Sequence, residues 1–146
     1  RGLIGNRDIH LVPEALPALY HSRVGIIASG TATVEAALMG TAFVMVYRVS
    51  PLTYALGKPR VKVARYAMVN LIAGEEVVPE LVQHEFTAEN IVAELGKIIP
   101  DGEPRTRMLQ GLASVNEKLK KPDRDGGRPA ERAAEVILEM LNHPMP

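Results

Sequence analysis

The fold is decided by residues 24 to 49, which read VGIIASGTATVEAALMGTAFVMVYRV. Val24 to Ala28 is a continuous apolar run, and Ala42 to Val49 is a second run that only Arg48 interrupts, as expected of strands that are covered on both faces. Thr31 to Met39 lies between them with the length of a short helix, and Gly40 follows in the position that commonly ends one. Strand, helix and strand in this order are typical of an open parallel sheet, so we expect an α/β fold.

The flanking segments extend this pattern in both directions. Residues 9–12 are rich in β-formers and predict a strand, and Pro13 opens a predicted helix that ends at His21. Downstream, apolar periodicity and cap residues predict helices over residues 75–83, 87–99, 104–120 and 129–141. The polar, Pro/Gly-rich stretch between the last two helices predicts a linker. We therefore expect one lobe over residues 1–120, a linker over 121–129 and a terminal helix within 130–146.

Composition limits the functions that are open to the chain. Its 146 residues, 47% of them hydrophobic, are enough for one domain with a substantial core. Zero cysteines exclude a disulfide framework, a thiolate zinc site and a cysteine nucleophile, and the four dispersed histidines show no spacing typical of metal ligands. Zero net charge argues against a basic nucleic-acid binder. A start at Arg1 rather than at methionine leads us to expect part of a longer protein.

The charges are nevertheless segregated along the chain. Residues 36–74 contain no acidic residue but five basic ones, whereas residues 75–103 contain eight acidic residues against one lysine. Such blocks can create a positive site on a neutral protein. The basic residues are Arg48, Lys58, Arg60, Lys62 and Arg65. Those from Lys58 to Arg65 alternate with apolar residues, which fits a surface that contacts anionic lipid or a phosphorylated acceptor, although a solvated face explains them too.

Ser29-Gly30-Thr31 connects the first buried strand to the helix that follows. Free N–H groups and the helix dipole favour an anion at such a junction, and ligands of open α/β sheets bind at the carboxyl ends of the strands. An ordinary helix cap explains the same residues equally well. Glu35 lies one turn further along the helix. Its carboxylate can there accept hydrogen bonds from both hydroxyls of a ribose whose phosphates lie at the start of the helix. A solvated glutamate on the helix surface is the alternative.

Two further polar residues follow apolar runs. Arg48 ends the second run, at the predicted ligand-binding edge, where its guanidinium suits a phosphate; a surface arginine is the alternative. Asn70 begins the segment Asn-Leu-Ile-Ala-Gly, which predicts a loop that lines a cleft; an asparagine that caps a turn is as compatible with the spacing.

Three blocks of sequence resemble the bacterial lipid-A-disaccharide synthase family. Ala28 to Glu35 (ASGTATVE) matches the family's A-S-G-T-A-T-x-E, and Val44 to Pro51 (VMVYRVSP) matches a strand that ends in Y-R-x-x-P. Asn70 to Leu81 (NLIAGEEVVPEL), followed by Gln83, matches N-L-[LI]-A-G-x-x-x-x-P-E-L. The blocks occur in the family's order with ordinary gaps. Val69 stands where the family usually has proline before the asparagine, which affects the rigidity of that segment.

This resemblance implies half of a GT-B glycosyltransferase, the carboxy-terminal UDP-binding lobe, built as a Rossmann-like three-layer lobe with a parallel sheet and C-terminal helices. The family transfers 2,3-diacylglucosamine from UDP-2,3-diacylglucosamine to 2,3-diacylglucosamine 1-phosphate, giving the β-1,6 lipid A disaccharide and UDP. It implies no metal and no other cofactor. The general base would lie in an amino-terminal lobe that this chain does not contain, so we expect no catalytic residue here and no activity from the chain alone.

The resemblance also implies roles for individual residues and partners. Ser29, Gly30 and Thr31 would hold the diphosphate with Thr33 close by, and Glu35 would hold the ribose. Other substrate contacts would come from Arg48, Asn70 and Gln83, whereas the acceptor or membrane contacts would come from Lys58, Arg60, Lys62 and Arg65. Expected partners are the amino-terminal lobe, the acylated substrates, the cytoplasmic face of the inner membrane and a second copy docked through the terminal helix, but no nucleic acid.

Two alternatives stay open on the sequence. One is another UDP-sugar enzyme of GT-B fold, such as a lipid II-type transferase or a UDP-GlcNAc 2-epimerase. The other is a module that keeps the nucleotide-binding fold without catalysis.

Overall fold

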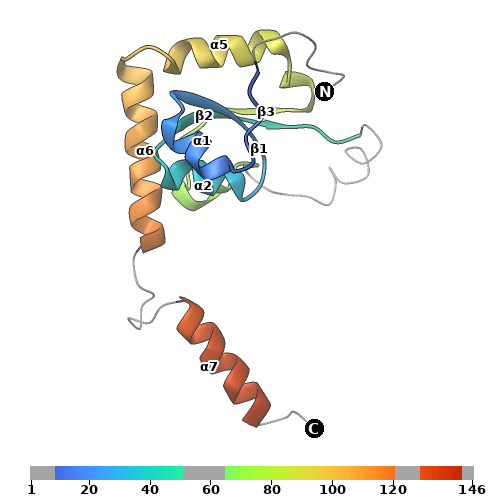
Figure 1. Cartoon of the computed structure of the whole chain (residues 1–146), viewed down its shortest axis with the longest axis vertical. Helices are drawn as coiled ribbons and strands as arrows, with labels where there is room; N and C mark the ends of the chain where they lie inside the picture. Colours follow the sequence, from blue (N-terminus) through green and yellow to red (C-terminus); the bar gives the residue numbers. More distant parts are fainter. Residues whose placement is uncertain (1–8, 51–64, 121–128, 143–146) are drawn as a thin grey trace. The chain divides into compact units, whose positions relative to one another are not determined.

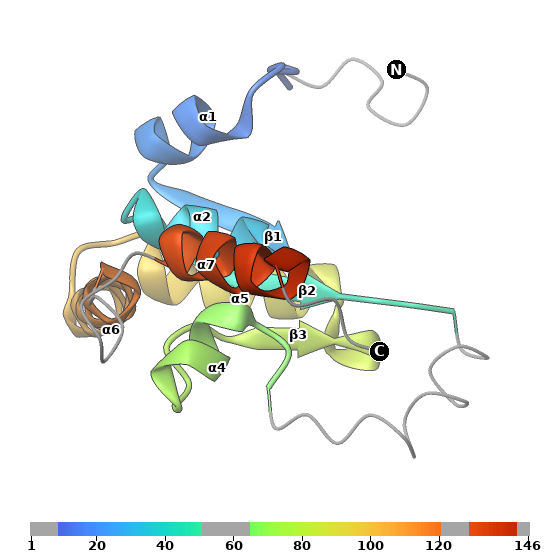
Figure 2. The same ribbon diagram turned by 90° about the horizontal axis from the view of Figure 1, so that it is seen from below.

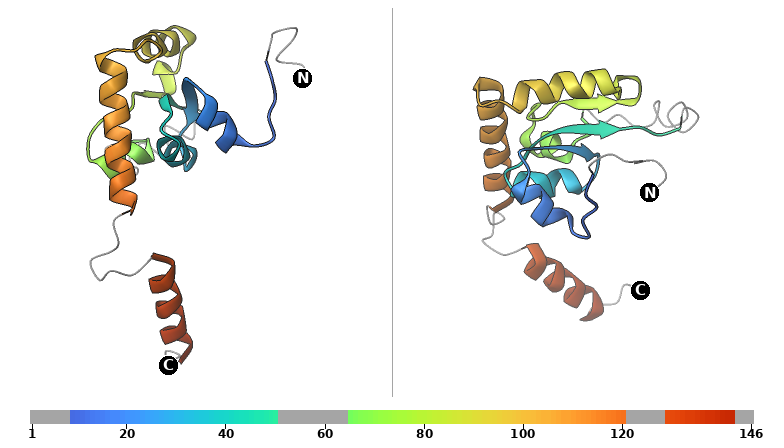
Figure 3. Two further views of the ribbon diagram at one scale, coloured as in Figure 1. Left: turned by 60° about the vertical axis from the view of Figure 1, so that its left-hand side comes forward. Right: turned by 45° about the horizontal axis from the view of Figure 1, so that its top comes forward.

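The computed structural model describes residues 9–50, 65–120 and 129–142. Three strands, β1 (Val24–Ala28), β2 (Ala42–Tyr47) and β3 (Glu80–Val82), form one sheet in the order β1-β2-β3. Both pairings are parallel, with Ala28 opposite Val46 and Tyr47 opposite Val82. The carboxyl ends of all three strands therefore meet at one edge of the sheet (Figure 3).

Helices cover both faces of this sheet. Helix α5 (Ala88–Ile98) lies on one face, while α2 (Ala32–Leu38) and α4 (Met68–Ala73) lie on the other (Figures 1 and 2). Helix α1 (Ala15–His21) contacts α2, and α6 (Glu103–Lys120) adds three buried side chains to the core. The predicted α/β fold with a parallel sheet and C-terminal helices is confirmed.

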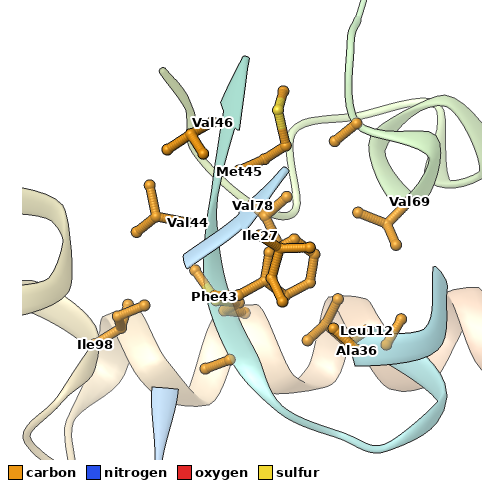
Figure 4. Packing of buried hydrophobic residues seen from close by; sticks show 14 of the residues in the cluster. Ile27, Ala36, Phe43, Val44, Met45, Val46, Val69, Val78, Ile98 and Leu112 are labelled. Atoms are coloured by element: carbon orange, nitrogen blue, oxygen red, sulfur yellow. The ribbon is translucent and has the colours of Figure 1, made fainter. Parts of the chain in front are cut away.

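The core is aliphatic and centres on β2. Its residues alternate between the two faces, so that Val44 lies toward Ile98 of α5, whereas Met45 points the other way, toward the side of Val69 (Figure 4). The fully buried side chains of the cluster also include Phe43, Val78 and Leu112. Burial on both faces explains why β2 is a continuous apolar run.

The chain divides into two compact units, residues 1–116 and 117–146. The second unit contains the end of α6 and the helix α7 (Pro129–Asn142). Helix α7 confirms the predicted terminal helix, and its large apolar side chains from Val136 to Leu141 are exposed. The predicted limits at residues 120 and 129 stay predictions. Within the described ranges, no helix is both long and apolar enough to cross a membrane.

Several predicted elements are confirmed with small shifts. Thr87 caps α5 as predicted, because its hydroxyl accepts a hydrogen bond from the Asn90 N–H at 3.2 Å. Gly40 follows the end of α2 with a φ of 71°, a left-handed conformation that glycine adopts easily. The strand predicted to reach Val49 ends at Tyr47.

Two other predictions are wrong. Residues 9–12 form no strand; Ile9, Leu11 and Val12 are exposed, and Pro13 follows them without a strand partner in the described part of the chain. Residues 75–83 form no α-helix, since the chain turns at Gly74, runs through Pro79, enters β3 and reaches a short 3-10 turn only at Gln83. Pro79 cannot donate a helical hydrogen bond, and its carbonyl instead accepts from the Met45 N–H in β2.

Candidate functional site

The turn between β1 and α2 has the backbone of an anion site. Thr31 precedes the helix but makes no side-chain cap. The Ser29 N–H donates to the Val46 carbonyl, and the next N–H with a described acceptor is that of Thr33, which donates to the Gly30 carbonyl. The N–H groups of Gly30, Thr31 and Ala32 have no acceptor among the described residues. Gly30 has a φ of 140°, a conformation that residues with side chains rarely adopt, and a Cβ built there would meet no atom within 4 Å.

The predicted hydroxyls of this turn have different surroundings. Ser29 Oγ donates to the carbonyl of Tyr66 at 2.9 Å, and Thr33 Oγ1 donates to the carbonyl of Gly30 at 2.7 Å. Thr33 is fully buried, whereas the side chain of Thr31 is exposed. Of these three hydroxyls, only that of Thr31 donates to no described residue, while those of Ser29 and Thr33 shape the turn.

Glu35 lies one turn into α2, as predicted, because its N–H donates to the Thr31 carbonyl. The residue is half-buried, and no described residue donates a hydrogen bond to its carboxylate or forms an ion pair with it. Within the described residues, both carboxylate oxygens thus remain without a partner, one helical turn beyond the N–H groups of residues 30–32.

Arg48 and Gln83 are brought together where β2 and β3 end. Arg48 donates from Nε and Nη2 to the Gln83 carbonyl, at 3.3 and 3.1 Å, and from Nη2 to the Phe86 carbonyl. Its guanidinium carbon lies 4.9 Å from the centroid of the Phe86 ring. In return, the side-chain Oε1 of Gln83 accepts from the Val49 N–H at 3.1 Å. Neutral groups thus hold the guanidinium in place, and no described carboxylate pairs with its charge.

Gln83 opens the short 3-10 turn Gln83–Glu85 that follows β3, and it has a φ of 55°. A left-handed backbone is uncommon for a residue with a side chain. The three hydrogen bonds that Gln83 makes with Arg48 and Val49, just after β2, hold it in this conformation.

Asn70 corrects the sequence interpretation. It lies in helix α4, not in a loop, and it is fully buried. Its Nδ2 donates to the Val78 carbonyl and to Glu80 Oε1, both at 2.8 Å. Its Oδ1 accepts from the N–H groups of Val77 and Val78, at 2.9 and 3.0 Å. The amide has no donor left for a ligand, so the structure gives Asn70 the role of joining α4 to the segment before β3.

The basic stretch is described only in part. Lys58, Arg60 and Lys62 lie outside the described residues, whereas Arg65 is half-buried just before α4. Arg65 borders a hollow of about 330 Å³ beside β3. The other residues that line this hollow are Tyr66, Glu76, Glu80, Val82, His84 and Glu85.

Sequence reasoning missed Glu80 and Tyr66. Glu80 accepts three hydrogen bonds, and the ring of Tyr66 stacks on that of Tyr47 with centroids 6.0 Å apart. A glutamate at the start of an apolar strand needs partners, which was the available signal for Glu80. No described group of three or more carboxylates or histidines could hold a metal ion.

Comparison with known proteins gives a consistent result. Residues 6–126 match the family described as Lipid-A-disaccharide synthetase. A lipid-A-disaccharide synthase of Koribacter versatilis is 49% identical over 132 residues, which are 90% of this chain and 34% of that protein. Those of Acidobacterium capsulatum and Solibacter usitatus are 50% and 41% identical, over 91% and 96% of this chain and 32% and 37% of their own lengths.

The chain thus spans about a third of the length of the curated relatives it matches. The family match covers far more than half of the chain, and it includes the β1–α2 turn, Arg48, Glu80 and Gln83. On this evidence the chain belongs to the lipid-A-disaccharide synthase family.

Proposed function

We propose that the chain is the UDP-binding, carboxy-terminal lobe of a lipid-A-disaccharide synthase with GT-B architecture. The whole enzyme transfers 2,3-diacylglucosamine from UDP-2,3-diacylglucosamine to the 6-hydroxyl of 2,3-diacylglucosamine 1-phosphate. The anomeric centre is inverted, and the products are the β-1,6 disaccharide and UDP. This lobe contributes the site for UDP.

One observation carries the proposal: no described residue accepts a hydrogen bond from the N–H groups of residues 30–32, which lie at the carboxyl edge of a parallel sheet. Unsatisfied N–H groups and the helix dipole attract an anion to such a position. The β-phosphate of UDP fits here, with the hydroxyl of Thr31 as a further donor. Negative charge grows on this phosphate as the glycosidic bond breaks, so the donors stabilise the leaving group more in the transition state than in the bound substrate.

Glu35 supports the same assignment. It lies one turn beyond the open N–H groups, roughly 5 Å along the helix axis. A ribose linked to the bound diphosphate places its 2′ and 3′ hydroxyls at this depth, where one carboxylate can accept from both. Glu35 thus selects a nucleotide over inorganic phosphate.

Arg48 supplies the fixed positive charge of the site. Backbone carbonyls and the Phe86 ring orient its guanidinium, yet they leave its charge uncompensated. With this cation and the helix N–H groups stabilising the departing diphosphate, the reaction needs no metal ion. Gln83 orients Arg48 and reaches the same edge, which makes it a contact for the donor sugar.

The remaining parts of the proposal concern the rest of the enzyme. The base that deprotonates the acceptor hydroxyl belongs to an amino-terminal lobe, so the 146-residue chain binds UDP but transfers nothing. The enzyme works at the cytoplasmic face of the inner membrane, where its acylated substrates reside. Helix α7 packs on the other lobe or on a second copy through its apolar residues.

Calorimetric titration of the 146-residue chain with UDP tests the proposal. We expect a dissociation constant in the range of about 0.1–1 mM, because half of the cleft contributes only part of the binding energy. Glu35→Gln should weaken UDP binding by about tenfold, since it removes hydrogen bonds to a charged acceptor. Inorganic phosphate should bind equally to both proteins, because Glu35 contacts only the ribose.

Glu89→Gln is the matched control, since Glu89 is an exposed glutamate in the first turn of α5. It should bind UDP as the unmodified chain does. Absence of UDP binding at millimolar concentration, or equal losses in Glu35→Gln and Glu89→Gln, would contradict the proposal. The described residues contain nothing that favours the alternative UDP-sugar enzymes over this assignment.

A further inference from the structure

The peptide groups of Tyr66 are held from two sides by residues distant in the sequence. Ser29 Oγ, at the end of β1, donates to the Tyr66 carbonyl at 2.9 Å. The Tyr66 N–H donates to Glu80 Oε2 of β3 at 2.8 Å. The Tyr66 ring also stacks on that of Tyr47, which ends β2. Tyr66 therefore connects the carboxyl-end region of the first two strands with the start of the third.

Glu80 is the anchor of this connection. Besides the Tyr66 N–H, its Oε1 accepts from the Ala67 N–H at 2.9 Å and from Asn70 Nδ2 at 2.8 Å. Ala67 occupies the N-cap of α4 in an extended conformation and has no side chain that can cap. Glu80 thus caps α4 from the neighbouring strand, where a carboxylate also interacts favourably with the helix dipole.

The consequence reaches the β1–α2 turn through Ser29. A serine hydroxyl has one proton, and that of Ser29 is committed to the Tyr66 carbonyl. The side chain of Ser29 can keep its orientation only if Tyr66 stays in place, and Glu80 fixes Tyr66. Ser29 directly precedes Gly30, whose open N–H begins the anion-binding turn.

We infer that Glu80 is a positioning residue for this turn: through Tyr66 and Ser29 it holds the N–H groups of residues 30–32 in the arrangement that accepts an anion. Three N–H donors from the chain bind the carboxylate of Glu80, so we assign it to holding the chain rather than to contacting the ligand. The identity of the ligand rests on the proposed function, whereas the order of the turn can be measured without any ligand.

The first experiment therefore uses the free 146-residue chain. Backbone amide NMR of Glu80→Gln and Ser29→Ala should show shifted resonances for Gly30, Thr31 and Ala32. Their order parameters should fall from roughly 0.85 toward 0.6. Glu75→Gln is the control, since Glu75 is exposed and makes no side-chain hydrogen bond within the described part of the chain; it should leave the turn unchanged.

This experiment separates positioning from mere capping of α4. If Glu80→Gln disturbs only residues 66–70 and leaves the resonances and order parameters of residues 30–32 unchanged, the inference is wrong. Thermal midpoints are recorded for each variant so that loss of folding is recognised. If Glu80→Gln fails to fold, Ser29→Ala still breaks the same connection at its other end. Unchanged resonances and order parameters of residues 30–32 in Ser29→Ala would then overturn the inference.

The second experiment measures UDP affinity in a double-mutant cycle. Each single variant should weaken UDP binding by roughly fivefold to tenfold, as expected when one hydrogen bond of an ordered network is lost. The double variant should lose no more UDP affinity than the single variant with the larger loss, because both changes break the same connection. Losses that multiply would show independent roles and overturn the inference. If the unmodified chain binds no UDP, the proposed function fails, and the NMR comparison alone decides the role of Glu80.

Discussion

Replacing Asn70 with alanine gives the sharpest test of the corrected role of this residue. The substitution removes four hydrogen bonds, two to the backbone of Val78, one to the Val77 N–H and one to Glu80. Val78 is fully buried, so both its N–H and its carbonyl lose their partners away from water. Each buried polar group without a partner costs about 1–3 kcal/mol. The two groups of Val78 count in full, whereas water can reach the N–H of the half-buried Val77. We therefore expect the free energy of unfolding to fall by about 3 kcal/mol.

Urea unfolding followed by circular dichroism measures this loss, and the thermal midpoint should fall by about 10 °C. Asn90→Ala is the control, because Asn90 is an exposed asparagine whose Nδ2 donates one hydrogen bond, to the Glu85 carbonyl. It should cost no more than about 0.5 kcal/mol. If Asn70→Ala keeps its stability but loses UDP affinity, Asn70 contacts the ligand, and its role as a structural link between α4 and the segment before β3 is refuted.

Three further predictions concern packing, capping and the site. Gly111→Ala should lower the free energy of unfolding by about 1–3 kcal/mol, because the new Cβ would lie 2.6 Å from a methyl carbon of Val77. Gly96→Ala, in a helix position with no atom within 4 Å, should instead raise it by about 0.5–1 kcal/mol, and equal effects of the two would contradict the packing. Thr87→Ala should cost about 1 kcal/mol through loss of the α5 cap, visible as faster amide exchange in the first turn of that helix alone. Arg48→Lys should weaken UDP binding by about tenfold in calorimetry although the charge is kept, because an ammonium lacks the planar fork of donors with which the guanidinium bonds both carbonyls while it stacks on the Phe86 ring. Unchanged affinity would show that charge alone suffices.

Elements whose signals are local could be predicted from the sequence. The burial of β2 on both faces required an uninterrupted apolar run, and Thr87 and Gly40 carry conformational preferences that act within a few residues. These signals depend little on the rest of the fold. They placed β1, α2, β2, α5 and α6 almost correctly.

The segment 75–83 failed for a non-local reason. Its acidic and apolar residues have helical spacing, but the N–H groups of Val77 and Val78 find an acceptor in the side chain of Asn70. Leu81 and Val82 then pair with β2. Tertiary partners thus overrode local propensity, and no window of sequence around residue 80 contains those partners.

In the candidate site, too, local features could be predicted from the sequence, whereas features that depend on tertiary partners could not. The turn at residues 29–31 and the position of Glu35 follow from local geometry, and the structure places them as expected. What the hydroxyls do could not be predicted, because Ser29 donates to a carbonyl 37 residues away. A serine at a helix start is a cap, a ligand donor or a tether according to which acceptor lies nearest, and that acceptor is set by the folded chain.

Glu80, at the start of β3, and Arg48, just after β2, are each held by uncharged groups rather than by an opposite charge. Glu80 is satisfied by three N–H donors, and Arg48 by two backbone carbonyls, so they form no ion pair with each other in the described structure. The dipole at the start of α4 stabilises the negative charge of Glu80, while Arg48 is exposed and keeps a cation toward solvent. Using backbone groups rather than opposite charges orients both side chains without neutralising Arg48. A carboxylate introduced beside Arg48 would neutralise its charge without changing the fold. We therefore expect the affinity of this edge for anions to depend on the absence of a pairing acid as much as on the presence of the arginine.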